Sequence, residues 1–319
     1  MMKKTSILLT LCVIACSFTS PRPVRPHQKS ELRTIVIDPG HGGFDPGCHG
    51  LFAKEKDVAL AISLKLGKAI EQAFPDIKVI YTRTTDIMPG NARNIHDGCV
   101  YRADMANRAH GDLFLSIHCN SNGKSAGIYH AKKLIGHKMV GKGRKRRRVP
   151  IYETYSIKNR TVGTTSFVWK ATWGEYKSTM INGAGGGEDM GDSTAIIDVS
   201  SPEARMRAQL YEKKYFANSA LFATYVQDEF LKSGRVSEGV QQREVGIWVL
   251  EATGMPSILV ETGYLTNKEE EQYLSSKGGQ NEVVHNILDA LRRYKSSLDG
   301  DGGTNTTRVN PRSPVRTAR

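Results

Sequence analysis

The chain of 319 residues is long enough for one large α/β domain or two small ones. With 39% hydrophobic and 24% charged residues, it has the composition of an ordinary globular protein and not of a disordered or fibrous one. Its formal net charge of +13 would suit an acidic partner, such as nucleic acid, anionic lipid or an anionic polymer.

The N-terminal segment resembles a secretory leader. Lys3 and Lys4 precede an apolar run over residues 7–15 that is too short to cross a bilayer. The run ends at Cys16, and a small residue followed by Cys is typical of a lipoprotein processing site, at which Cys16 would be acylated. The alternative is ordinary cleavage near this position. We therefore expect a signal peptide over residues 1–19, export to the periplasm or cell envelope, and membrane contact only through this anchor.

The first part of the chain after the leader predicts alternating strands and helices. Residues 34–37 form a β-branched run that enters a turn of Pro and Gly carrying His41. From Glu55 onward, apolar residues recur at steps of three and four, which indicates an amphipathic helix that ends before Pro75. Further elements are expected over residues 79–81 (strand), 102–109 (helix) and 113–117 (strand). This order predicts an α/β fold, a single domain with a central mostly parallel sheet flanked by helices on both faces.

Residues 123–201 interrupt this pattern, and a long, weakly periodic segment inside a compact domain is usually functional or mobile. The segment contains the basic run 138–148, in which no aromatic residue interleaves with the Lys and Arg side chains. A platform for stacking nucleic-acid bases is therefore not supported. We expect a solvated basic loop and no nucleic-acid ligand.

The remainder of the chain becomes periodic again. We expect helices over residues 202–230 and 281–294, and strands over residues 246–250 and 256–260. Residues 297–319 contain few apolar side chains and are expected to be disordered. Beyond the leader, three cysteines remain, Cys48, Cys99 and Cys119, and their odd number argues against a complete disulfide framework, although one bridge stays an alternative.

Four ligand-capable side chains are expected at one edge of the sheet. His41, His118 and Glu261 each follow a predicted strand, and Glu55 begins the helix that returns from the first strand. Because the carboxyl ends of parallel strands meet at the same edge, residues far apart in sequence can converge there. Taken singly, Glu55 could be a helix N-terminal carboxylate, His118 a core histidine and Glu261 a turn cap.

Two imidazoles and one carboxylate are a familiar ligand set for catalytic zinc, with the fourth position left to water. A second carboxylate can take the proton of that water and pass it to a leaving amine. The residue types therefore fit zinc-dependent amide hydrolysis. The spacing alone does not establish it, because the compact His-Glu-x-x-His helix motif is absent.

The sequence also resembles the zinc-dependent N-acetylmuramoyl-L-alanine amidases of bacterial cell walls. Four ordered motifs carry this resemblance: residues 35–43 (IVIDPGHGG), 54–58 (KEKDV), 116–120 (SIHCN) and 258–264 (ILVETGY). Arg83 and residues 102–112 resemble family positions as well, without an assigned role. The resemblance implies an amidase catalytic domain over about residues 33–296. Residues 20–32, which begin with a Pro-rich stretch containing Arg and His, are expected to be a tether between membrane and domain.

The resemblance also implies roles for single residues. His41, Glu55 and His118 would be ligands of Zn²⁺, and Glu261 would be the catalytic carboxylate. The substrate would be peptidoglycan, cut at the amide between the lactyl group of N-acetylmuramic acid and L-alanine, for wall remodelling or daughter-cell separation. We expect the chain to act as a monomer.

Two departures from the family stand out. Cys119 replaces an alanine that is commoner beside the second histidine. The 123–201 insertion lies where some relatives carry a helix with a glutamate that blocks the metal, although its glycine content argues against one long helix. Glu153, Glu175 and Glu188 are the candidate blocking ligands, and we expect an activator protein or wall contact to relieve such autoinhibition.

Two alternatives stay open. One is a different zinc hydrolase of peptidoglycan, such as a carboxypeptidase, which needs the same metal chemistry. The other is a non-catalytic wall-binding lipoprotein, which would be expected to lack one of the four key residues. All four are present, and no repeated wall-binding module is found outside the catalytic region.

Overall fold

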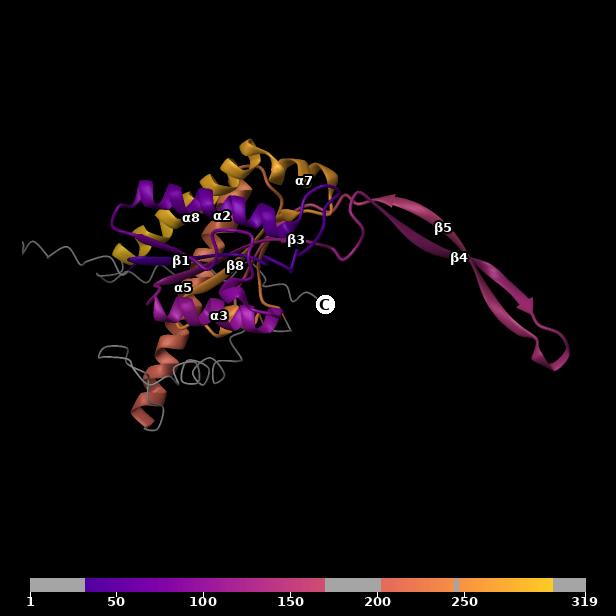
Figure 1. Cartoon of the computed structure of the whole chain (residues 1–319), viewed down its shortest axis with the longest axis horizontal. Coiled ribbons are helices and arrows are strands. Elements are labelled where there is room, and N and C mark those ends of the chain that lie inside the picture. The colour runs from indigo at the N-terminus through magenta and orange to yellow at the C-terminus, as the bar shows by residue number, and fades with distance from the viewer. Residues whose placement is uncertain (1–31, 170–201, 244–246, 301–319) are drawn as a thin grey trace, which may run out of the picture. The chain divides into compact units, whose positions relative to one another are not determined.

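The computed structural model describes residues 32–169, 202–243 and 247–300, without the side chains of residues 202–208. A six-stranded sheet in the order β2-β1-β3-β8-β6-β7 forms its centre (Figure 1). The strands are β1 (Thr34–Pro39), β2 (Lys78–Tyr81), β3 (Leu113–Asn120), β6 (Thr164–Phe167), β7 (Ser237–Gln241) and β8 (Ser257–Tyr264). All neighbours pair in parallel except β6 and β8, so the expected mostly parallel sheet is confirmed.

Helices cover both faces of the sheet, as expected. They are α2 (Glu55–Ala73), α3 (Ile95–Arg108), α5 (Pro202–Lys232), α6 (Trp248–Glu251), α7 (Lys268–Ser275) and α8 (Lys277–Gly300), with 3₁₀ turns at Pro89–Asn91 and Gly143–Lys145. Alternate residues of β1 enter two separate cores: Ile35 and Ile37 pack with α2, α5 and α8, whereas Val36 packs with α3 and α6. Figure 1 shows α2 and α8 on one side of the sheet and α3 on the other.

The expectation of a solvated basic loop was wrong, and much of the weakly periodic segment forms strands. Residues 128–158 form a hairpin of β4 (Ile128–Val140) and β5 (Arg147–Lys158), and β6 belongs to the central sheet. Most hairpin side chains are exposed on both faces, so the sequence lacks the alternation of apolar and polar residues that marks a half-buried strand. The basic run is therefore not a loop, because its ends lie in paired strands.

Three other boundaries differ from expectation. The apolar run at residues 247–250 belongs to the one-turn helix α6 and its N-cap, and not to a strand. In so short a buried run, the spacing of apolar residues cannot distinguish a helix from a strand. Helix α3 begins at Ile95, not at residue 102, since Asn94 caps it by accepting from the Asp97 N–H. Helix α8 continues to Gly300 into the expected tail, with Leu298 against the core.

At the N-terminal boundary, Leu32 is buried in the core and is not part of a tether. The expected leader and the rest of the expected disordered tail lie outside the described residues. Among the helices that are described, none is long and apolar enough to span a bilayer.

Candidate metal centre

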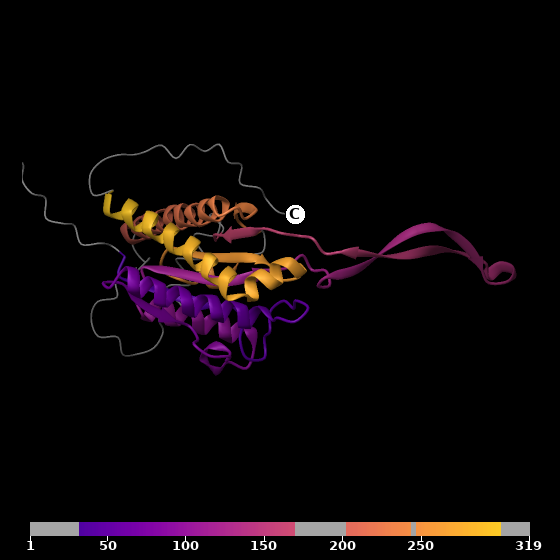
Figure 2. The same ribbon diagram turned by 90° about the horizontal axis from the view of Figure 1, so that it is seen from above.

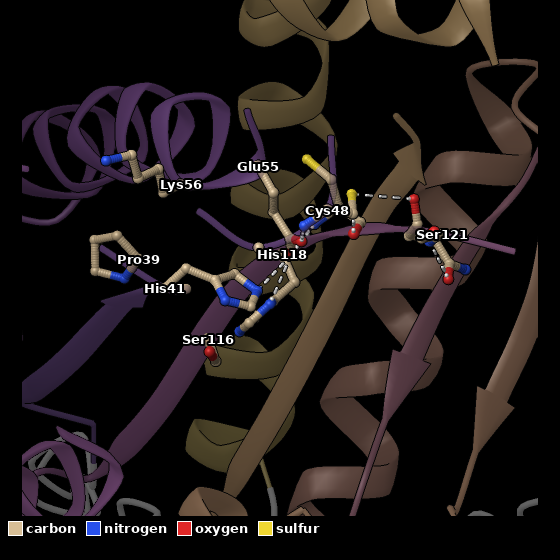
Figure 3. Close-up of polar contacts among 12 residues, drawn as sticks. Pro39, His41, Cys48, Glu55, Lys56, Ser116, His118 and Ser121 are labelled. Atoms are coloured by element: carbon tan, nitrogen blue, oxygen red, sulfur yellow. Dashed lines mark hydrogen bonds and ion pairs between the residues drawn. The ribbon is translucent and has the colours of Figure 1, made fainter. Parts of the chain in front are cut away.

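His41, Glu55 and His118 converge at the carboxyl edge of the sheet. His41 follows β1, Glu55 is the first residue of α2, and His118 lies near the end of β3. One ligand atom from each lies within 4.8 Å of the others. The Glu55 Oε1 atom is 3.1 Å from His41 Nε2 and 2.8 Å from His118 Nδ1. Figure 3 shows the two imidazoles and the carboxylate turned toward one another.

Backbone hydrogen bonds fix the orientation of the buried Glu55 carboxylate. The Cys48 N–H donates to Oε2 at 2.7 Å, and the Cys119 N–H donates to Oε1 at 3.0 Å. Burial raises the pKa of Glu55, but the imidazoles of His118 and His41 outweigh this and hold the pKa well below its usual range. Glu55 is therefore a charged ligand-capable group and not only a helix N-terminal carboxylate.

His41 is held in an uncommon backbone conformation, with φ of 59°. Its Nδ1 atom lies 2.8 Å from the Asp45 carboxylate, which can only accept, so Nδ1 carries a proton and Nε2 faces Glu55. Burial lowers the pKa of His41, but Glu55 and then Asp45 raise it to about 9. A carboxylate that orients a ligand histidine in this way is common around protein-bound metals.

Two buried arginines hold the backbone of the turn that carries His41. Arg83 donates to the carbonyl oxygens of Pro39 and Gly40, at 3.1 and 2.7 Å. Arg102 donates to the carbonyl oxygens of Pro39 and His41, at 2.9 and 2.6 Å, and forms an ion pair with Asp38. These contacts give Arg83 and Arg102 the positioning role that the sequence left unassigned.

Two glycines allow the backbone to approach the ligands closely. A Cβ atom on Gly40 would lie 2.4 Å from the His118 ring, and one on Gly47 would lie 2.5 Å from Glu55 Oε2. Gly47 also has φ of 67°, which other residues rarely adopt. Substitution at either position would therefore displace a ligand side chain.

Glu261 lies beside this group, because β8 pairs with β3 in a register that places Glu261 opposite His118. The two histidines, Glu55 and Glu261 all line a pocket of about 440 Å³. The Oε2 atom of Glu261 is buried and forms no hydrogen bond within the described residues. Burial and, next, the Glu55 carboxylate raise the pKa of Glu261 to about 8.

Other pocket residues were not found from the sequence. Arg243 lies over the Phe167 ring, at 5.7 Å from its centroid, and both line the pocket. Trp248 of α6 also lines it and contacts the His96 ring edge to face. These side chains come from segments with no motif, so only the fold brings them to the ligands.

Within the described residues, no candidate blocking glutamate lines the pocket, and the cysteines form no disulfide. Glu153 is exposed on β5 opposite Lys133 and does not line the pocket, whereas Glu175 and Glu188 lie outside the described residues. Cys48, Cys99 and Cys119 are free. Burial raises the pKa of the Cys119 thiol well above its usual range, which favours the protonated thiol.

The donor set fits a divalent metal ion. It offers two imidazole nitrogens and one carboxylate oxygen, and hydrogen bonds with Asp45 and Cys48 already orient His41 and Glu55. A search of the described residues for three or more His, Cys, Asp or Glu side chains close enough to share one ion finds these three residues.

The family model for N-acetylmuramoyl-L-alanine amidases (Amidase_3) matches residues 35–293. The chain belongs to this family. The matched range includes all four sequence motifs, so the resemblance on which the sequence analysis relied is confirmed.

Among similar family members is the N-acetylmuramoyl-L-alanine amidase AmiC of Escherichia coli O6:H1, which is 28% identical over 278 residues, or 86% of this chain and 56% of AmiC. The probable amidase AmiB of Haemophilus influenzae is 25% identical over 279 residues, or 86% of this chain and 53% of AmiB. The chain thus spans about half the length of these relatives. The crystal structure of an amidase from Clostridium difficile 630 shares the fold, with a TM-score of 0.52, 21% identity and coverage of 84% of this chain and 99% of that one.

Proposed function

We propose that this amidase family member is a zinc-dependent hydrolase of the amide bond between N-acetylmuramic acid and L-alanine in peptidoglycan. The observation that carries the proposal is the convergence of His41 and His118 on one oxygen of Glu55, beside Glu261 in the same pocket. Family membership supports the substrate class.

His41, Glu55 and His118 would hold the metal. Neutral imidazole nitrogens and a carboxylate oxygen are ligands that zinc accepts readily, and three protein ligands leave a position open for substrate or water. Zinc in such a site supplies Lewis acidity, which polarises the scissile carbonyl and makes water a stronger nucleophile at neutral pH. The Asp45 carboxylate keeps the His41 Nε2 atom directed at the site.

Glu261 would move the proton. Its carboxylate accepts a proton from the attacking water, whose oxygen forms the new bond to the carbonyl carbon. When the carbon–nitrogen bond breaks, the carboxyl group of Glu261 returns that proton to the leaving amine of L-alanine. In the metal-free site, burial and the Glu55 carboxylate raise the pKa of Glu261, whereas the positive charge of a bound metal would favour the carboxylate form that the first proton transfer needs.

Substrate contacts are proposed for two side chains of the pocket. Arg243 supplies a cation that suits a carboxylate of the stem peptide. Trp248 supplies an apolar ring against which the face of a sugar can pack. Neither is needed to bind the metal, so both are specificity candidates.

The location and regulation of this activity are further parts of the proposal. The basic and apolar segment at residues 1–19 supports export to the cell envelope, where peptidoglycan lies. There the enzyme would serve wall remodelling or daughter-cell separation. An activator that opens the site would act on the part of the insertion that contains Glu175 and Glu188.

Mass analysis of peptidoglycan digested with the zinc-loaded protein tests this function. The expected products are free stem peptides that begin with L-alanine, together with unsubstituted glycan. Release of a terminal D-alanine alone would instead identify a carboxypeptidase. A digest identical to that of heat-inactivated protein, from a folded and zinc-loaded sample, would contradict both.

A further inference from the structure

The hairpin of β4 and β5 is separate from the catalytic pocket. Its strands pair continuously, with one bulge, from Ile128 opposite Lys158 to Val140 opposite Arg147, and neither strand pairs with the central sheet. A strand of 13 residues spans roughly 40 Å. Figure 2 shows the hairpin extending from the sheet, and none of its residues lines the pocket. It therefore needs a role other than forming the active site.

Most of the net positive charge of the chain lies on this hairpin. Residues 128–158 contain ten Lys and Arg side chains and one acidic side chain, Glu153, against a net charge of +13 for the whole chain. Six of the ten occur at the tip, and all six are exposed: Lys142, Arg144, Lys145, Arg146, Arg147 and Arg148. Like charges packed this closely repel one another, so the tip is expected to bind an anionic surface.

Exposed apolar side chains accompany these cations. Met139 and Val140, which directly precede the tip, are 53% and 39% exposed, and Leu134 and Ile135 are 49% and 56% exposed. Large apolar side chains beside a cluster of Lys and Arg are typical of elements that bind lipid headgroups while burying apolar groups at the acyl boundary. A soluble polyanion would satisfy the charges but would leave the apolar side chains in water.

We propose that the tip of the β4–β5 hairpin docks the enzyme on a membrane surface rich in anionic phospholipid. Lys142 and the arginines after it bind the lipid phosphates, and Met139 and Val140 enter the interface. The pocket stays outside the contact, so the docked enzyme can still act on its substrate. This contact would exist beside the expected lipid anchor, so membrane contact would not be limited to that anchor, and it does not depend on the proposed hydrolase activity.

Vesicle co-sedimentation of the chain from residue 20 onward, without the expected leader, tests the docking. The vesicles contain phosphatidylcholine with or without phosphatidylglycerol, and binding is expected only with phosphatidylglycerol and to weaken as salt increases. Replacing the six tip cations by Gln should lower the partition coefficient by at least about tenfold. The double variant Met139→Ser with Val140→Ser should also lower it, without changing the charge.

A matched control distinguishes an effect of the hairpin tip from an effect of the net charge of the chain. The control variant replaces six exposed cations of the sheet-and-helix part by Gln: Lys68, Lys78, Lys213, Lys268, Lys277 and Arg292. It should bind vesicles as the unmodified chain does, and circular dichroism should show all variants folded. Equal losses in the tip and control variants, or binding unaffected by the tip variant, would overturn the proposal. A tip variant that loses binding to RNA or polyphosphate while keeping vesicle binding would overturn it in favour of a soluble polyanion.

Discussion

The Arg102 guanidinium donates a hydrogen bond of 2.6 Å to the backbone carbonyl oxygen of His41. The same side chain is paired with Asp38 and donates to Pro39, so one buried group connects the end of β1 with the turn that carries a candidate ligand. The geometry of the candidate metal centre thus depends on a residue that is not one of its candidate ligands.

Arg102→Lys should lower zinc affinity by about 10–100-fold, as is usual when a group that positions a ligand is lost. The charge is kept, but an ammonium group cannot reproduce the planar set of donors that reaches Asp38, Pro39 and His41 together. Competition with a chromogenic chelator measures the affinity. Arg108→Lys, at an exposed position of the same helix, is the control and should leave affinity unchanged. Equal affinities in both variants would refute the positioning role.

Asp38→Asn should destabilise the fold by about 3–5 kcal/mol, because it leaves Arg102 as an unpaired buried charge. Burial raises the pKa of Asp38, but Arg102, Thr82 and Ser116 outweigh this and lower the pKa below 3.8. The stabilisation is therefore present above about pH 4 and is lost as the pH falls through the lowered pKa. Urea unfolding of both proteins across this range measures it. A stability difference that widens toward low pH would contradict the assignment.

Glu271→Gln should loosen the turn before Glu55. The buried Glu271 carboxylate of α7 accepts the N–H groups of Leu51, Phe52 and Ala53 at 2.9, 2.7 and 2.8 Å. An amide has only one acceptor oxygen, so we expect a loss of about 1–3 kcal/mol in unfolding free energy and weaker zinc binding. The control is the exposed Glu269→Gln on the same helix. If the two variants unfold and bind zinc alike, Glu271 does not position this turn.

Arg243→Gln should raise KM for stem-peptide substrates by about 10–100-fold with little change in kcat, since a charge-assisted hydrogen bond contributes about 1.5–3 kcal/mol. The effect should disappear with substrates whose peptide carboxylate is amidated. Steady-state kinetics on both substrates measure it. A fall in kcat at unchanged KM would show that Arg243 acts on the reaction and not on binding.

The sequence predicted the position of a side chain where that residue directly follows a recognisable strand. His41, His118 and Glu261 each follow an apolar run, and parallel pairing then brings them to the same edge. It was uninformative where position depends on tertiary packing. Glu271 and Arg243 approach the site from segments far away in the chain, and no local pattern marks them. Strand β6 is short and polar, and the hairpin has two solvated faces, so neither has the period of a half-buried strand.

Zinc content and turnover measured together on Glu261→Gln test the central claim most directly. A Gln side chain cannot accept the proton but leaves His41, Glu55 and His118 in place. The variant should therefore retain stoichiometric zinc while its turnover falls by at least about 10²–10⁴-fold, whereas His41→Ala should lose the metal. Full zinc in a folded His41→Ala variant, or substantial amide cleavage by Glu261→Gln, would contradict the account.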